Sequence, residues 1–405
     1  MSLVRQSIPV ARPVLDRAEA DAAGRAILSG WVTQGPEVHS FEREFAAAVG
    51  APHACAVSNC TTALHLALRA AGVGPGDEVV TVSHSFIASA NAVRYCGATP
   101  VFVDIDPATF NMDASRVDAA VRPRTRAILA VHQLGMPCDM AKLVEIARRR
   151  YLPLIEDAAC AAGSEILWNG RWEPIGKPHG DAACFSFHPR KVITTGDGGM
   201  ITTRHEDWDT QFRLWRQHGM SIPDTVRHHA SSVTFEEYPT LGYNYRMTDI
   251  QAAVGREQLK RLAGIVARRR ELANRYRERL AGRLPQVVLP HEPEWARSNW
   301  QSFCVRLPRP VDQRAVMQAM LERGISTRRG VMCAHQEAAY ASEPWHCGDR
   351  GPVSCVCGPR RCRALAHSEQ ATREGLILPL FTQMTDVDQD EVVDALAAAL
   401  SLCAV

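Results

Sequence analysis

Long apolar runs are lacking in this sequence. No window approaches the roughly 20 apolar residues of a membrane-spanning helix, and the first five residues form no apolar core of signal-peptide length. Charge of one sign is lacking too: the net charge is +2, so nothing draws the chain to nucleic acid or to an anionic membrane. These absences predict a cytoplasmic protein whose partners include neither nucleic acid nor membrane.

Cysteine pairs with the Cys-x-x-Cys spacing of strong zinc sites are also lacking, although the chain has thirteen cysteines. Without a secretory signal, we expect these thiols to stay reduced. Several lie inside apolar runs and are expected to be small core residues: Cys55, Cys96, Cys184 and Cys304. Others share one stretch with a histidine: His346, Cys347, Cys355, Cys357 and Cys362. Their irregular spacing predicts a loop of free thiols without a metal, and a zinc site is the alternative.

Short apolar runs alternate with helical patterns from about residue 40 to residue 205. Five runs are typical of buried strands: residues 78–82, 100–103, 127–131, 152–155 and 182–185. Helical patterns lie between them, at residues 61–71, 89–95 and 140–150. This alternation predicts an α/β domain with a mainly parallel sheet covered on both faces. In such sheets, ligands bind at the carboxyl ends of the strands.

The C-terminal third has a different pattern. Thr248 and Gln251 form a capping-box pattern that predicts the start of a helix. Arginines recur along it, and the glutamates between them indicate a solvated face: Arg268, Arg269, Arg270, Arg275, Arg277 and Arg279, with Glu271 and Glu278. Beyond residue 285, a strand-like run at 302–307 and helical patterns at 311–323 and 388–400 predict a smaller α+β domain, with a long loop at 343–366. We expect a large domain over residues 1–265 and a small one over residues 266–405.

One lysine, Lys191, lies in a polar, glycine-bounded turn after an apolar run. A lysine that forms a Schiff base with an aldehyde cofactor must be reachable and must swing aside, and a loop between strands allows both. About 35 residues earlier, Asp157 ends a buried strand, where a carboxylate can pair with the protonated pyridine nitrogen of pyridoxal 5'-phosphate (PLP). Taken alone, Lys191 is better explained as a surface lysine in a turn, and Asp157 is equally well explained as a helix-capping aspartate. Their order, with a strand between them, predicts a PLP site.

The phosphate and the ring of such a cofactor need further groups. Residues 57–64 are predicted to form a strand, a turn and the start of a helix near Thr61, where free amides and the helix dipole favour an anion. The hydroxyls of Thr61 and Thr62 are in reach, and Ser186 adds a donor. Phe86 follows a strand and is placed to stack on the ring. The alternatives are ordinary N-capping by threonine and a core phenylalanine.

Further motifs run along almost the whole chain. They lie at residues 35–38, 41–42, 56–68, 76–79, 91–93, 97–104, 155–159, 185–199, 242–248, 378–380 and 384–385. In these motifs the chain resembles the DegT/DnrJ/EryC1/StrS sugar aminotransferases. The resemblance implies the aspartate-aminotransferase-like fold (PLP fold type I) for the large domain.

The resemblance also implies a role for each matching residue. Lys191 would hold the cofactor covalently, Asp157 would pair with its pyridine nitrogen, and Phe86 would stack on the ring. The phosphate would be held by Cys60, Thr61 and Ser186. Asn244 would reach the phosphate from a neighbouring subunit, which implies a homodimer with shared active sites. Candidates for substrate contacts are Gln34, His188 and Arg246, for which structural roles stay equally open.

Two departures from the family pattern concern the cofactor. Cys60 stands where the family usually has glycine, which keeps a backbone amide contact but leaves less space. Cys160 stands where the family usually has a glutamine that contacts the ring near its phenolic oxygen, and a thiol is a poorer donor.

The implied function is that of a PLP-dependent aminotransferase. An amino acid, by family analogy L-glutamate, would donate its amino group, with the freed Lys191 as general base and then acid. The acceptor would be a keto-sugar nucleotide or a keto-cyclitol. The alternatives are a sugar dehydratase or lyase on the same scaffold and a non-catalytic regulatory homologue. The dehydratase branch typically replaces the lysine by histidine, and the presence of both Lys191 and Asp157 argues against a regulator.

Overall fold

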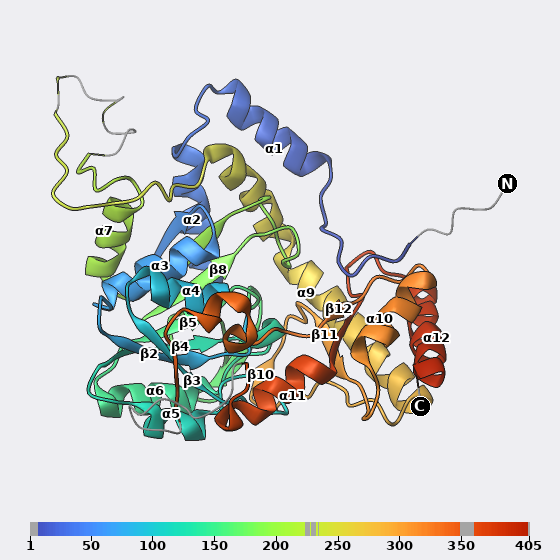
Figure 1. Cartoon of the computed structure of the whole chain (residues 1–405). Helices are drawn as coiled ribbons and strands as arrows, with labels where there is room; N and C mark the ends of the chain where they lie inside the picture. Colours follow the sequence, from blue (N-terminus) through green and yellow to red (C-terminus); the bar gives the residue numbers. More distant parts are fainter. Residues whose placement is uncertain (1–6, 223–226, 228–231, 234, 349–359, 404–405) are drawn as a thin grey trace.

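The computed structural model describes residues 7–222, 227, 232–233, 235–348 and 360–403 (Figure 1). Among these residues, the central sheet has eight strands in the order β1-β9-β8-β5-β4-β2-β3-β13. β9 is antiparallel to both of its neighbours, and the other pairs are parallel. The strands are β1 (His53–Val57), β2 (Glu78–Val82), β3 (Thr99–Val103), β4 (Thr125–Val131), β5 (Leu154–Asp157), β8 (Ala182–Ser186), β9 (Gly199–Thr203) and β13 (His346–Cys347). The predicted mainly parallel α/β sheet is confirmed.

Helices cover both faces of this sheet because its strands are apolar on both sides. One face packs against α2 (Pro36–Val49), α5 (Ala114–Ala120) and α6 (Met140–Arg150), with Phe41, Phe45 and Leu143 in its core. The other packs against α3 (Cys60–Ala70), α4 (Ala88–Tyr95) and α7 (Glu206–Trp215), with Leu64, Val93 and Phe212 in its core. Successive side chains of a strand point to opposite faces of the sheet. In β2, Val80 and Val82 therefore face the first core and Val79 faces the second.

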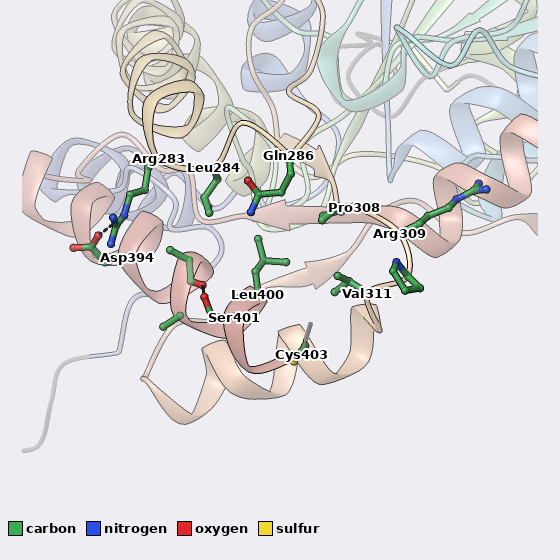
Figure 2. Close-up of a pocket in the computed structure, with 13 residues that line it drawn as sticks. Arg283, Leu284, Gln286, Pro308, Arg309, Val311, Asp394, Leu400, Ser401 and Cys403 are labelled. Atoms are coloured by element: carbon green, nitrogen blue, oxygen red, sulfur yellow. Dashed lines mark hydrogen bonds and ion pairs between the residues drawn. The ribbon is translucent and has the colours of Figure 1, made fainter. Parts of the chain in front are cut away.

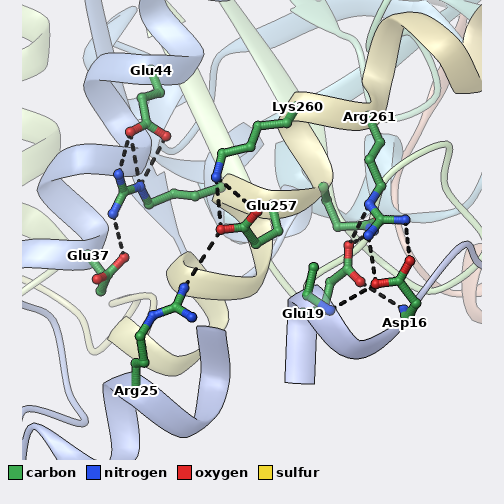
Figure 3. Close-up of polar contacts among 11 residues, drawn as sticks. Asp16, Glu19, Arg25, Glu37, Glu44, Glu257, Lys260 and Arg261 are labelled. Carbon is green, nitrogen blue, oxygen red and sulfur yellow. Dashed lines mark hydrogen bonds and ion pairs between the residues drawn. The ribbon is translucent and has the colours of Figure 1, made fainter. Parts of the chain in front are cut away.

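The long helix α9 (Asp249–Arg283) begins as predicted at a capping box. The Thr248 hydroxyl accepts from the Gln251 N–H, and the Gln251 side chain accepts from the Thr248 N–H. α1 (Arg17–Leu28) and α2 lie against α9 and are tied to it by surface ion pairs (Figure 3). Arg256 binds Glu37 and Glu44, and Arg261 binds Asp16. Each exposed pair adds about 0–1 kcal/mol, so apolar packing remains the main attachment.

A second core lies beyond the middle of α9. It joins the C-terminal half of α9 to α10 (Gln313–Glu322), α12 (Asp386–Cys403) and a small antiparallel sheet. That sheet has the order β11 (Phe303–Arg306), β14 (Gly375–Leu378), β12 (Arg328–Arg329), and α11 (Ala366–Glu374) precedes β14. A further hairpin, β6 (Glu165–Trp168) and β7 (Arg171–Pro174), pairs with β10 (Ala296–Arg297).

The expected boundary at residues 265/266 falls inside α9, which runs unbroken from one core to the other (Figure 1). Val266 packs in the first core and Leu272 in the second, so one helix serves both. The N-terminal segment, which we expected in the large domain, places Ile8 beside Ile325 in the second core. Ile8 is an isolated apolar residue with no pattern around it, so the sequence gives no sign of this pairing.

Two expectations about the C-terminal third are corrected. Arg269 is buried rather than solvated, because its guanidinium donates to two backbone carbonyls inside the protein. The stretch 343–366 is not wholly a loop, because its short β13 extends the sheet beside β3. A strand of two residues is too short to give a period that sequence analysis can detect.

Other expectations about this stretch are settled only in part. Cys355 and Cys357 lie outside the described residues. In the part of the chain that is described, no group of three His, Cys, Asp or Glu side chains is arranged to hold a metal.

Four cysteines elsewhere in the chain are buried as predicted: Cys55, Cys96, Cys184 and Cys304. No helix of the described ranges has the length and apolar character that a membrane crossing requires.

Candidate active site

A cavity of about 890 Å³ lies at the carboxyl ends of β4, β5 and β8. Another part of its lining comes from the small antiparallel sheet and the chain after β12, through residues 328–332 and 377–378. Most of the residues singled out in the sequence line it: Cys60, Thr61, Phe86, Asp157, Cys160, Ser186, His188 and Lys191. The fold therefore gathers side chains that lie up to 131 positions apart in the chain into one site.

Lys191 follows a turn closed by its own N–H, which donates to the His188 carbonyl at 2.8 Å. Its Nζ donates to Cys160 Sγ at 3.0 Å. Burial disfavours the charge on this amine, but the Cys160 sulfur, which accepts its hydrogen bond, and the nearby Asp157 carboxylate outweigh burial and raise the pKa of Lys191. Without a cofactor, the amine is therefore protonated at neutral pH and held against Cys160.

Asp157 is a buried carboxylate without a cationic partner. It is 5% exposed, and it takes part in none of the ion pairs of the described residues, although its charge acts on the Lys191 amine in the same cavity. Neutral groups hold it: Ser89 Oγ donates to Oδ2 at 2.7 Å, and the Ala159 N–H donates to Oδ1 at 3.2 Å. A buried charge needs compensation, and a protonated pyridine nitrogen in the cavity would supply it. This unpaired carboxylate is the feature that best fits PLP.

Ser89 was missed by sequence reasoning. Its hydroxyl touches Ser85 Oγ at 2.7 Å on the other side, so two buried serines lead to the Asp157 carboxylate. Ser89 lies in the first turn of α4 and Ser85 lies in the bend before that helix, so no helical periodicity links the two serines in the sequence.

The N-terminus of α3 offers amides for the cofactor's phosphate. Asn59 caps the helix and shares a capping box with Thr62, whose hydroxyl donates to the Asn59 carbonyl at 2.7 Å. Thr62 is therefore a capping residue, which was the alternative for it, and it also lines the cavity. The N–H groups of Cys60 and Thr61 find no acceptor among the described residues, and they point out of a helix end that favours anions. Gly199 allows β9 to approach this turn, because a Cβ there would meet the backbone of Asn59 and Cys60.

The side chain of Cys60 turns away from this amide site. Its Sγ lies 3.4 Å from the Cys184 carbonyl, and burial raises the pKa of the thiol well above its usual value. The thiol is therefore neutral and directed at β8. The loss of space expected from a cysteine in place of glycine is limited accordingly.

Phe86 and His188 face the same cavity. Phe86 is 64% exposed, so its ring is available to stack on a flat ligand. Burial and the neighbouring Arg190 lower the pKa of His188, which keeps the imidazole neutral. Its Nδ1 accepts from the Arg190 N–H at 3.2 Å, so Nε2 carries the proton and can donate to a substrate oxygen.

Three predicted residues lie elsewhere in the single chain. Gln34 contacts Gln217, whose backbone pairs with Asn244, and Arg246 donates to the Asn244 side chain. These residues form a group of their own outside the described lining of the cavity.

A second cavity of about 590 Å³ lies between the end of α9, residues 308–311 and α12 (Figure 2). Its basic residues already have acidic partners: Arg283 pairs with Asp394 and Arg309 with Glu374. None of the site residues predicted from the sequence lines it.

Comparisons with known proteins identify the family of this chain. A model of the DegT/DnrJ/EryC1/StrS aminotransferase family matches residues 13–397. GDP-perosamine synthase of Caulobacter vibrioides is 40% identical over 97% of this chain and 98% of its own. Among solved structures, S. venezuelae DesV in complex with a ketimine intermediate is 34% identical, with a TM-score of 0.83 over 97% of this chain and 98% of its own. The PLP form of Streptococcus pneumoniae Spr1654 is 25% identical, with a TM-score of 0.86 over 98% of this chain and 99% of its own.

These similarities confirm the predicted aminotransferase activity, the PLP cofactor and the fold. The chain belongs to the DegT/DnrJ/EryC1/StrS aminotransferase family.

Proposed function

We propose that this aminotransferase moves the amino group of an amino acid, with L-glutamate as the expected donor, to a keto-sugar nucleotide. One observation carries the assignment of the chemistry: the Lys191 amine and the unpaired, buried Asp157 carboxylate share a cavity. The relative named GDP-perosamine synthase supports a nucleotide-linked acceptor.

Each of the principal residues of the cavity has its own role in this reaction. Bound PLP supplies an electron sink for the donor's Cα carbanion. Asp157 keeps a proton on the ring nitrogen, and Ser89 orients Asp157. Lys191 Nζ would take the proton from the donor's Cα and deliver it to the C4′ carbon of the cofactor, and Cys160 Sγ would hold this amine in place between the two events. Phe86 covers the ring, and the amides of Cys60 and Thr61, with the Ser186 hydroxyl, bind the phosphate.

Charge at the cavity favours a nucleotide acceptor over a neutral keto-cyclitol. Among the described lining residues, basic side chains outnumber acidic ones: Arg190, Lys191, Arg328 and Arg329 stand against Asp157 and Asp197. Arg329 pairs with Glu337, whereas Arg190 and Arg328 have no acidic partner within the described ranges. Unpaired arginines suit a diphosphate, which they can bind through two hydrogen bonds each.

The active unit in this proposal is a cytoplasmic homodimer with shared sites. Asn244 is exposed and lies outside the cavity of its own chain, so it is available to a second copy. Exposed apolar side chains support the same idea: Leu28 is 89% exposed and Leu241 is 79% exposed.

The donor half of the reaction provides the direct test. Added to the PLP-loaded protein alone, L-glutamate is expected to remove the visible absorption of the lysine-bound cofactor and to release one oxoglutarate per site, because the amino group stays on the cofactor. D-glutamate is the control and should change neither signal. If no amino acid changes the spectrum, the transaminase proposal fails and the dehydratase, lyase or regulatory alternative takes its place.

The acceptor proposal predicts a specific effect of Arg328→Met. Loss of a charge-assisted hydrogen bond costs about 1.5–3 kcal/mol, so the Kd for a nucleoside diphosphate, measured by calorimetry, should rise roughly 10- to 100-fold. Arg329→Met, on the same strand but already paired with Glu337, should change the Kd less than threefold, a difference below about 0.7 kcal/mol. If Arg328→Met instead raises the KM for glutamate and leaves nucleotide binding unchanged, Arg328 serves the donor's carboxylate.

A further inference from the structure

Four consecutive buried residues connect the second core to the active site. We call Ser298, Asn299, Trp300 and Gln301 the support segment; each is at most 8% exposed. The segment lies between β10 and β11, and its last residue, Gln301, lines the cavity. We propose that it positions Lys191 and Cys160 relative to each other, with Gln301 as a positioning residue for the Lys191 amine.

Side chains of the support segment form hydrogen bonds with the backbone at Cys160 and with the backbone next to Lys191. Asn299 is fully buried, and its Nδ2 donates to the carbonyls of Cys160 and Ala162, each at 2.8 Å. Gln301 Nε2 donates to the carbonyl of Arg190, the residue before Lys191. The Asn299 Oδ1 accepts from the Gln301 backbone N–H at 2.8 Å, which fixes the Asn299 side chain to the backbone of Gln301. A shift of the segment would therefore move Cys160 and Lys191 at the same time.

Three arginines of α9 contact the support segment. Arg269 donates through Nε to the Trp300 carbonyl and through a terminal nitrogen to the Gln301 carbonyl, both at 2.8 Å. Arg270 donates to the Ser298 carbonyl at 3.0 Å, and Arg277 lies over the Trp300 ring at 4.5 Å. Each contact fixes the backbone or the ring of the segment, so α9 determines where the segment lies.

Two features of this arrangement are unfavourable for the stability of the fold: a buried guanidinium charge and a strained backbone. Arg269 is 6% exposed, and none of the described carboxylates pairs with it; burial lowers the pKa of its guanidinium to about 10. Trp300 has a φ of 51°, a left-handed conformation that costs about 1–3 kcal/mol in a residue with a side chain. Strain of this kind persists where surrounding contacts over-determine the backbone, and it gathers near active sites.

Gln301 also offers an unused acceptor to the site. Its Oε1 is buried without a hydrogen-bond partner among the described residues, and the residue lines the cavity that contains Lys191. Lys191 has three donor hydrogens when protonated, and Cys160 accepts only one. An acceptor fixed through Nε2 to the neighbouring backbone is suited to hold the amine when it leaves the cofactor.

The test is Gln301→Met, which keeps the length of the side chain and removes both polar atoms. In the cofactor-free protein, we expect the rate of Cys160 alkylation by iodoacetamide, followed by peptide mass spectrometry, to change at least threefold, because Cys160 and Lys191 are no longer held at one separation. In the PLP-loaded protein, the pH midpoint of the cofactor absorption should move by about half a unit, and kcat should fall about tenfold with the KM for glutamate within twofold.

Gln313→Met is the matched control. Gln313 Nε2 also donates to backbone carbonyls, those of Thr372 and Gly375, but the residue is the first of α10, is only partly buried and does not line the cavity. It should lower the melting temperature and leave Cys160 reactivity and the pH midpoint unchanged. Arg269→Lys, which keeps the charge but not the paired geometry, should reproduce the effects of Gln301→Met in weaker form.

Two results would overturn the proposal. One is unchanged Cys160 reactivity and an unchanged pH midpoint in Gln301→Met; the other is an equal change in Gln313→Met. The inference rests on the proposed function only for the role of Lys191. Cys160 alkylation needs no cofactor, whereas failure of the proposed function would show in the wild-type protein as the absence of a glutamate half-reaction.

Discussion

Lys191→Ala is expected to lower kcat by about 10⁴-fold, because the substitution removes both the covalent attachment of the cofactor and the base that moves the Cα proton. Borohydride reduction followed by intact mass measurement should add one cofactor to the wild-type chain and none to the variant. Added methylamine should restore part of the activity, since a small amine can enter the space that the lysine leaves.

Lys142→Ala is a suitable control for this change. Lys142 is 70% exposed and pairs with Asp139 on the surface. It should keep full activity and the full mass increment. A persistent increment in Lys191→Ala would assign the covalent link to another lysine and would remove the basis of the proposed site.

Asp157→Asn is expected to lower kcat by about 10²- to 10³-fold, as removal of a single electrostatic partner does in other active sites. The amide keeps the shape of the side chain and the hydrogen bond to Ser89 but carries no charge to hold a proton on the ring nitrogen. The measurement is kcat together with the cofactor absorption across the pH range, where the variant should lose the transition that belongs to the ring nitrogen.

Asp181→Asn separates this effect from a loss of stability. Asp181 precedes β8 and its carboxylate accepts from the Leu154 N–H at the start of β5, at the other end of the same strands. It should lower the melting temperature while kcat stays within twofold of the wild-type value, a difference of about 0.4 kcal/mol. Equal losses of kcat in both variants would mean that Asp157 acts through the fold and not through the cofactor.

The alternation of strands and helices and the candidate site residues could be proposed from the sequence because their signals are local. Asp157 follows an apolar run, Lys191 lies in a glycine-bounded turn, and the parallel sheet brings the two strand ends together. Capping boxes are also local, which is why the start of α9 was predicted at the right residue.

The supporting contacts could not be predicted, because they join residues far apart in sequence. Asn299 reaches Cys160 across 139 positions, and Ser89 reaches Asp157 across 68. Nothing in the residues around Arg269 separates it from the solvated arginines beside it, since its burial depends on the backbone carbonyls of Trp300 and Gln301. The positions of Gln34, Asn244 and Arg246 outside the cavity likewise depend on tertiary structure.

The continuity of α9 restricts how the enzyme can admit its substrates. A helix of 35 residues is about 50 Å long and bends little without a proline or a bulge. Because α9 contributes residues to both cores, the second core cannot rotate away from the first as a rigid body without breaking hydrogen bonds within this helix. Entry of substrates into the cavity is therefore expected to depend on movements of side chains that line it, such as Phe86, Arg190 and Arg328. Inhibitors that immobilise these side chains should block entry without changing the arrangement of the helices and strands.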